Sequence, residues 1–218
     1  MNAAERRRRL AALLPAVMFV ADVARAGESR RDLAPVAAAA VAGGVAIVQI
    51  RAPGVAHDDL LALGARLRDA VDGRALIFVN GDPRAAEALG AGGLHVPERA
   101  LAALPDREAM LVSRAVHDIA GARAAEAAGA DLLVFGSVFV TPSHPDGTAA
   151  GLDALAETCA AVRVPVLAIG GVRADNAQSC VAAGAAGVAV IGALLDAPEP
   201  RATARALVAA VRSGAPVR

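Results

Sequence analysis

The sequence predicts an α/β fold, a single (β/α)8 TIM barrel that occupies the whole chain, residues 1–218. Eight short apolar runs alternate with longer Ala-rich amphipathic stretches, as a parallel sheet covered by helices requires. The length of 218 residues suits one domain of this class. The composition is 56% hydrophobic but only 2% aromatic, which fits a barrel interior filled by branched aliphatic side chains.

The order of these runs assigns each expected element. The expected strands are residues 16–21, 45–50, 75–79, 93–95, 110–113, 132–135, 165–169 and 187–191. The expected helices are residues 32–42, 58–71, a short helix from 83, then 98–103, 119–128, 152–162, 175–183 and 201–212. Residues 1–14, with their run of four arginines, are expected to be a basic extension ahead of the first strand.

The composition excludes several classes of function. Basic and acidic residues balance at 22 each, and no basic stripe is interleaved with aromatic residues, so we expect no nucleic-acid partner. No apolar stretch is long enough to span a membrane, and no signal-peptide cleavage site follows the basic N-terminus, so we expect a cytoplasmic protein. The chain has no lysine, which excludes Schiff-base aldolase and pyridoxal phosphate chemistry. The sequence leaves open whether copies of the chain form a homo-oligomer.

Two cysteines, Cys159 and Cys180, fall inside expected helices and outside any metal-binding motif. We interpret both as small buried hydrophobic residues. Neither a disulfide framework nor a zinc site is expected.

Active sites of such barrels lie at the carboxyl ends of the strands. Paired glycines, Gly170 and Gly171, follow the seventh expected strand, and Ile191 and Gly192 end the eighth. Backbone N–H groups there can approach a phosphate without a side chain in the way, and a following helix N-terminus adds its dipole. The sequence therefore predicts a small phosphorylated ligand.

Further polar side chains stand at other strand ends. Arg51 can pair with a phosphate through two hydrogen bonds, and Gln49 and Asn80 offer neutral amides. His95 is expected to satisfy a backbone group inside the barrel mouth. His144 lies in a long Gly/Pro-rich loop of the kind that often covers an active site.

The strand-end residues, taken in order, resemble the thiamine phosphate synthase family, which includes a thiazole tautomerase branch. The resemblance covers nearly the whole chain, from about residue 17 to 212. It rests on an ordered series of motifs: VQIR at 48–51, VN at 79–80, GAGGLHV at 90–96, VHD at 116–118, EAAGADLLVFGSVFVTPS at 126–143, VPVLAIGGV at 164–172 and AAGAAGVAVIGAL at 182–194.

The resemblance implies a reaction and a set of site residues. The family enzyme joins hydroxymethylpyrimidine diphosphate to a thiazole phosphate and releases pyrophosphate with the assistance of Mg2+. The candidate catalytic residues are Arg51, Ser137 and His144. The candidate substrate-binding residues are Gln49, Asn80, His117, Thr141, Ser143, Gly170, Gly171, Ile191 and Gly192.

The sequence departs from the family pattern in the half of the site that binds the diphosphate. The two magnesium-binding aspartates of the family fall at Gly81 and Ala100, and a diphosphate-binding serine falls at Ala115. Two family lysines fall at Pro53 and His144. The thiazole phosphate half is largely kept.

These departures leave three functions open. The first is the family synthase with a rebuilt diphosphate site, for which Asp82 and Glu98 are the nearest carboxylates that could hold Mg2+. The second is a tautomerase-like or other metal-independent enzyme acting on a phosphorylated ligand, although Ser137 stands where the tautomerase branch has its catalytic histidine. The third is a non-catalytic protein that binds a phosphorylated ligand.

Overall fold

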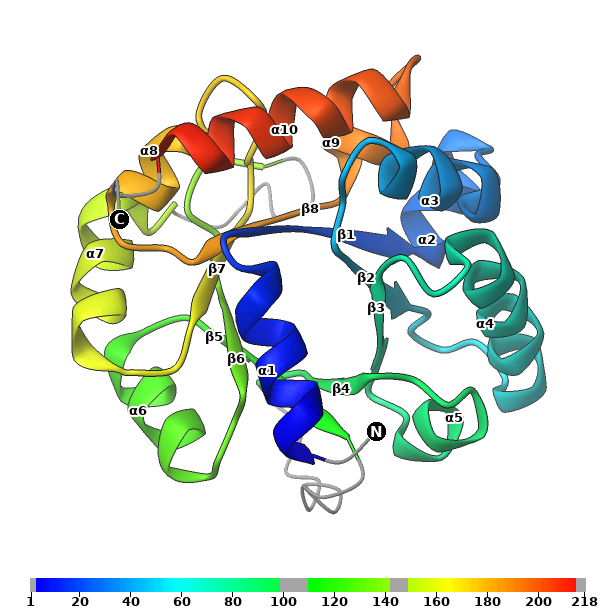
Figure 1. Cartoon of the computed structure of the whole chain (residues 1–218), viewed down its shortest axis with the longest axis horizontal. Coiled ribbons are helices and arrows are strands. Elements are labelled where there is room, and N and C mark those ends of the chain that lie inside the picture. The colour runs from blue at the N-terminus through cyan, green and yellow to red at the C-terminus, as the bar shows by residue number, and fades with distance from the viewer. Residues whose placement is uncertain (1–2, 99–109, 142–148, 215–218) are drawn as a thin grey trace.

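The computed structural model describes residues 3–98, 110–141 and 149–214. Eight parallel strands close into a barrel in chain order, from β1 next to β2 round to β8 next to β1. Helices surround the barrel, and the view of Figure 1 looks onto the end that the helix α1 crosses. The (β/α)8 barrel predicted from the sequence is confirmed.

The elements have the following bounds. The strands are β1 Ala16–Asp22, β2 Ile47–Arg51, β3 Leu76–Asn80, β4 Gly93–Val96, β5 Leu111–Val116, β6 Leu132–Phe135, β7 Val166–Ile169 and β8 Gly187–Val190. The helices are α1 Ala3–Leu13, α2 Val23–Ser29, α3 Leu33–Ala42, α4 His57–Val71, α5 Pro83–Ala88, α6 Ile119–Ala127, α7 Gly151–Ala161, α8 Ala177–Ala182, α9 Gly192–Leu195 and α10 Pro200–Gly214.

Most boundaries agree with the sequence-based expectation to within two residues, but four regions differ. β5 continues three residues beyond the expected end, which places Ser113 in the middle of the strand. The basic extension is in fact the helix α1. Two short helices, α2 and α9, follow β1 and β8 directly. The expected helix at 98–103 lies almost wholly outside the described residues.

The core has two layers, as the alternation of side chains along a barrel strand requires. One layer fills the barrel interior and includes Met18, Phe78 and Leu132. The other, larger layer lies between the barrel and the helices. In the interior the Phe78 ring lies so close to Gly93 that a Cβ there would be 2.3 Å from it. A small residue on β4 is therefore what makes room for an aromatic ring on β3.

The helix α1 covers the amino-terminal end of the barrel. Its Leu10 is 3% exposed and packs into the barrel-interior layer. Arg7 donates from Nε to the Asp131 Oδ1 at 2.7 Å, and the other oxygen of Asp131 accepts from the Val112 N–H at 2.9 Å. A buried carboxylate thus joins α1 to the starts of β5 and β6.

Both cysteines lie in helices, Cys159 in α7 and Cys180 in α8, and both thiols are free. Burial raises the pKa of each thiol to about 11, so both stay protonated and behave as apolar side chains. Among the described residues, no helix is long and apolar enough to cross a membrane.

Candidate active site

The strand register brings the predicted polar residues to one end of the barrel. Asp22 pairs in register with Arg51, Asn80 with His95, and His95 with Ser113. Because parallel strands keep their carboxyl ends on the same side, these side chains share the carboxyl-terminal mouth. The mouth lies at the end of the barrel opposite to α1.

Arg51 forms an ion pair with Asp22 between neighbouring strands. Its Nη1 donates to Oδ2 of Asp22, whose side chain is only 4% exposed, whereas the side chain of Arg51 is 42% exposed. The second oxygen of Asp22 accepts from the Arg25 N–H at 3.1 Å and so caps α2. The carboxylate therefore holds Arg51 at the mouth while part of the guanidinium faces solvent.

The amides of Gln49 and Asn80 are linked. Asn80 Nδ2 donates to Gln49 Oε1 at 3.2 Å, and Gln49 Nε2 lies 3.7 Å from the Met18 sulfur. Gln49 is buried and Asn80 is half-buried. These contacts give both amides a defined orientation at the edge of the barrel interior.

His95 and Ser113 form a buried pair on β4 and β5. The His95 Nδ1 lies 2.8 Å from the Ser113 hydroxyl oxygen, and both residues are buried. Burial, with a smaller contribution from the positive charge of Arg51, lowers the pKa of His95 to about 4. The imidazole is therefore neutral at physiological pH, and its partner within the mouth is the Ser113 hydroxyl rather than the expected backbone group.

The two carboxylates nearest to the expected metal positions are already engaged. Asp82 caps α5 by accepting from the Ala85 N–H at 2.9 Å, and its other oxygen lies 2.9 Å from His57 Nδ1. Burial acts to raise the pKa of Asp82, but these hydrogen bonds outweigh it and the pKa lies below its usual value. Glu98 Oε2 lies 2.6 Å from His117 Nδ1.

These pairings limit the ability of the two carboxylates to bind magnesium. Gly81, where the family has an aspartate, has a positive φ of 77° and donates its N–H to the His95 carbonyl at 2.9 Å. Within the described residues no three His, Cys, Asp or Glu side chains come together as a metal-binding group. The described carboxylates therefore do not fit a magnesium site at the family position, and Ala100 lies outside the described residues.

The paired glycines after β7 pack against the segment that follows β6. A Cβ on Gly170, whose φ is +95°, would lie 2.5 Å from the Ser137 Cβ. A Cβ on Gly171 would lie 2.5 Å from the Val140 carbonyl oxygen. Hydrogen bonds from the Val138 and Phe139 N–H groups to Ile169 and Gly170 carbonyls, at 2.8 and 3.0 Å, hold the two segments together. The glycines thus permit a close approach between two strand ends.

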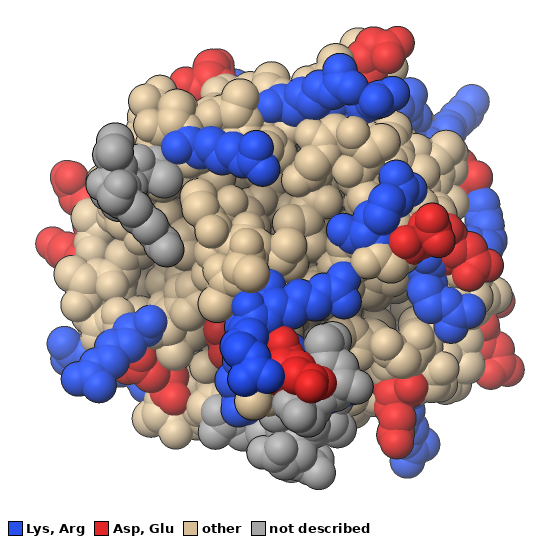
Figure 2. Space-filling view, in the orientation of Figure 1, with Lys and Arg blue, Asp and Glu red and all other residues tan. Residues whose placement is uncertain are grey.

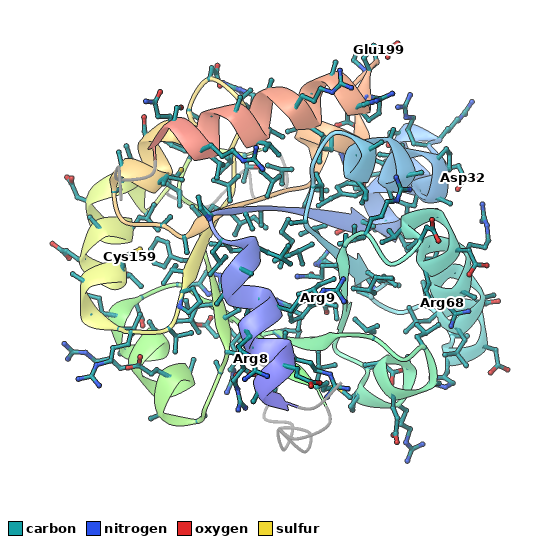
Figure 3. The ribbon with its side chains drawn as sticks, in the orientation of Figure 1. Arg8, Arg9, Asp32, Arg68, Cys159 and Glu199 are labelled. Atoms are coloured by element: carbon teal, nitrogen blue, oxygen red, sulfur yellow. The ribbon has the colours of Figure 1, made fainter. Side chains whose placement is uncertain are left out.

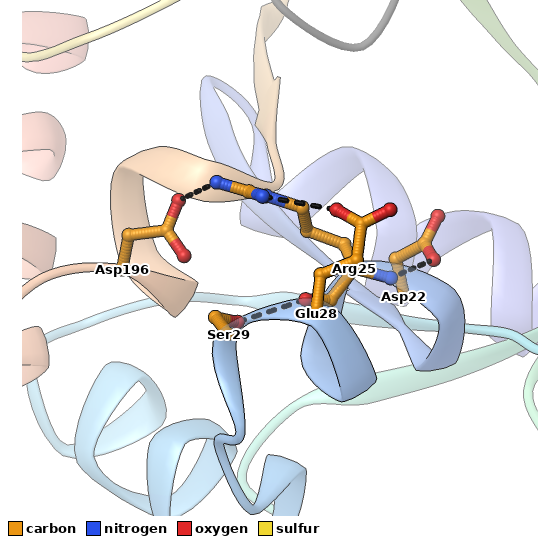
Figure 4. Close-up of polar contacts among 5 residues, drawn as sticks. All are labelled: Asp22, Arg25, Glu28, Ser29 and Asp196. Atoms are coloured by element: carbon orange, nitrogen blue, oxygen red, sulfur yellow. Dashed lines mark hydrogen bonds and ion pairs between the residues drawn. The ribbon is translucent and has the colours of Figure 1, made fainter.

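The end of β8 is organised by α9 and by a salt bridge. Gly192 is the first residue of α9, and Ile191 precedes it with its side chain against the barrel-interior layer. Asp196, which ends α9, accepts from Arg25 Nη2 at 2.7 Å, while Arg25 Nη1 lies 3.0 Å from Glu28. Figure 4 shows Arg25 between these carboxylates, with Asp22 at the start of the same helix. The ends of β1 and β8 are joined in this way.

The structure brings some predicted residues together and leaves others apart. Arg51, Gln49 and Asn80 gather at one side of the mouth. His117 is exposed, Ser137 is half-buried, and Thr141 is partly buried at the edge of a described range. Ser143 and His144 lie outside the described residues.

Sequence reasoning assigned no role to Asp22 and did not predict the contact between His95 and Ser113. A signal for Asp22 was present, because the residue stands at a strand end immediately before a helical stretch. The contact of Ser113 with His95 had no such signal, since it depends on the register between β4 and β5.

The sequence matches the family model described as "Thiamine monophosphate synthase" over residues 17–194, which is most of the chain. The chain belongs to the thiamine monophosphate synthase family. A "Putative thiamine-phosphate synthase" of Geobacter sulfurreducens is 40% identical over 185 residues, covering 82% of this chain and 87% of that protein. A "Thiamine-phosphate synthase" of Roseiflexus sp. is 38% identical over 203 residues, covering 90% and 85%.

A solved structure supports the same family assignment. The "Thiamine phosphate pyrophosphorylase" of Pyrococcus furiosus superposes with a TM-score of 0.81 at 26% identity, covering 95% of this chain and 98% of that one. The 3-hexulose-6-phosphate synthase structure, at 20% identity and a TM-score of 0.67, shares the fold. The family resemblance read from the strand-end motifs is therefore confirmed.

Proposed function

We propose that this chain is a thiamine-phosphate synthase, a transferase that joins hydroxymethylpyrimidine diphosphate to a thiazole phosphate. The observation that carries the proposal is the match to the thiamine monophosphate synthase family over residues 17–194, at 38–40% identity to relatives named for this activity. The polar residues gathered at the carboxyl-terminal mouth, Arg51, Gln49 and Asn80, supply groups that suit two phosphorylated substrates.

The reaction needs little from the protein beyond binding and charge stabilisation. The thiazole nitrogen forms a C–N bond to the methylene carbon of the pyrimidine, and the C–O bond to the diphosphate breaks. The electron pair of that bond leaves on pyrophosphate, and no proton has to move. A neutral, buried His95 is compatible with such a step, because no general base is required.

We assign roles to the predicted residues on this basis. Arg51 stabilises the charge that develops on the departing pyrophosphate. The Gln49 and Asn80 amides orient the pyrimidine. The backbone around Gly170, Gly171 and Gly192, with Ile191 beside it, receives the phosphate of the thiazole. Ser137 and His144 stay the other candidate catalytic residues beside Arg51. The side chains of His117, Thr141 and Ser143 complete the substrate-binding set.

Magnesium is part of this proposal only because the family resemblance implies it. A divalent cation bound to the diphosphate would neutralise the leaving group, but Asp82 and Glu98 are each paired with a histidine. We therefore assign no step of the reaction to a metal held by these residues. The expected cytoplasmic location, the lack of a nucleic-acid partner and the state of oligomerisation stay predictions.

The departures from the family pattern in the diphosphate half of the site favour one second candidate function. It is a metal-independent enzyme that acts on a thiazole phosphate. Gly81, which has a positive φ, stands where the family has an aspartate. The neighbouring Asp82 caps the helix α5. In that case the chain would bind thiazole phosphate without binding the pyrimidine diphosphate.

Isothermal titration separates the two candidates. The purified protein is titrated with thiazole phosphate and, separately, with hydroxymethylpyrimidine diphosphate in the presence of Mg2+ or EDTA. The synthase proposal predicts that both ligands bind. Binding of thiazole phosphate alone would favour the second candidate, and binding of neither would refute the assignment of the ligands.

A further inference from the structure

A cavity opens at the amino-terminal end of the barrel, opposite to the candidate active site. It measures about 320 Å3 and lies between α1, α4 and the residues that lead into β3 and β4. Its apolar lining includes Val71, Leu76 and Leu89. The volume is within the range of cavities that hold small organic ligands.

Three arginines line this cavity. Arg6 and Arg9 come from α1, and Arg68 comes from α4. Arg6 and Arg9 are three residues apart, a spacing that places two side chains on the same face of a helix. Figure 3 labels Arg9 and Arg68, and Figure 2 shows basic side chains gathered over α1 on this end of the molecule.

The charged residues that line the cavity are all basic. No carboxylate is among the lining residues. Asp69 is 3.7 Å from the Arg68 guanidinium, and both side chains are more than half exposed, so solvent screens their attraction. Arg9 donates from Nη2 to the Gly73 carbonyl at 2.9 Å, which holds its guanidinium at the rim.

The remaining side chains of the arginine run have other positions. Arg7 pairs with Asp131, and Arg8 is exposed and does not line the cavity. Leu10 anchors the helix in the barrel interior. Leu10 and Arg7 therefore hold the helix at points outside the cavity.

We propose that this cavity is a second binding site, for a small phosphate ester with an apolar portion. Guanidinium groups bind phosphate oxygens through paired, charge-assisted hydrogen bonds, and the apolar lining would cover the organic portion. A ligand here would connect α1 to α4 and would stabilise the folded chain by RT ln(1 + L/Kd), where L is the free ligand concentration. The inference does not depend on the proposed catalytic function.

Phenyl phosphate is a suitable probe. Its binding to the full chain is monitored by NMR of the methyl groups of Val71, Leu76 and Leu89. We expect saturable shifts of these methyl groups. R68E, and R9A combined with R68A, should weaken the binding by about tenfold or more. R8A, on the same helix, and R51A, at the opposite end of the barrel, should leave it unchanged.

Several outcomes would overturn the proposal. One is the absence of shifts at these methyl groups with millimolar probe. Another is an equal effect of inorganic phosphate, since the apolar lining would then contribute nothing. A third is unchanged binding in R68E. Under the proposal, R68A keeps the synthase turnover of the wild type. An experiment that refutes binding at this cavity is therefore distinct from one that refutes the proposed catalytic function.

Discussion

Arg51 and Asp22 form an ion pair across the β1–β2 ladder, with the carboxylate buried and the guanidinium half-exposed. The same carboxylate caps α2 through the Arg25 N–H. A residue that we expect to bind substrate is thus positioned by one that belongs to the fold. This relationship makes Asp22 a positioning residue, and it leads to the first prediction.

D22N should reduce synthase activity by about tenfold or more while the protein stays folded. Asparagine also caps helices well, so α2 should persist. The neutral amide cannot hold the Arg51 guanidinium as a carboxylate does, and a small displacement of a charged group near the reaction costs activity. Steady-state kinetics, with a pronounced rise in KM for the diphosphate substrate, would support this role. Wild-type kinetics in D22N would contradict it.

His95 should make the stability of the protein depend on pH. Its pKa is about 4 in the folded chain and about 6.5 when exposed, so the unfolded state binds a proton first as the pH falls. The folded state should lose about 3 kcal/mol from this group between pH 6.5 and pH 4. Urea unfolding at a series of pH values, compared with H95Q, isolates the contribution. Identical pH dependence in both proteins would rule it out.

Gly170 should tolerate alanine less well than Gly54. Both have positive φ, which costs alanine about 1 kcal/mol, but a Cβ on Gly54 meets nothing within 4 Å. A Cβ on Gly170 would lie 2.5 Å from Ser137, so the two segments must separate. We expect G170A to destabilise the chain by about 2 kcal/mol more than G54A in denaturant unfolding. Equal losses would mean that the close approach is unimportant.

The ion pair between Arg7 and Asp131 should contribute more to the stability of the chain than the side chain of the neighbouring Arg8 does. Removing Arg7 leaves a buried carboxylate without its cationic partner, which costs about 1–3 kcal/mol. R8A, the matched control on the same helix, removes only an exposed side chain and should change stability by less than about 0.5 kcal/mol. The comparison is made by urea unfolding, and similar values for R7A and R8A would show that α1 is not held by this pair.

Much of the fold was predictable because the apolar runs repeat with the period of a βα unit. The strand ends follow from those runs, which is why Arg51, Gln49 and Asn80 could be placed at one mouth. The helix α1 was missed because its arginine run looks like a solvated tail. The buried position of Leu10, the partner of Arg7 and the hydrogen bond from Arg9 to the Gly73 carbonyl explain why it docks.

The side-chain pairs of the site could not be predicted in the same way. The contact of His57 with Asp82 joins the start of α4 to the start of α5, and that of His117 with Glu98 joins segments 19 residues apart. Such pairings depend on loop geometry that no local pattern determines. The sequence placed Asp82 and Glu98 near the metal position, while the structure provides each with a histidine partner.

The most direct test of the central claim is turnover. The purified chain is incubated with hydroxymethylpyrimidine diphosphate, thiazole phosphate and Mg2+, and the phosphorus NMR spectrum is followed with time. The account predicts that pyrophosphate and thiamine phosphate appear in equal amounts, and that R51A lowers their rate of formation severely. Intact substrates after prolonged incubation with folded protein would contradict it.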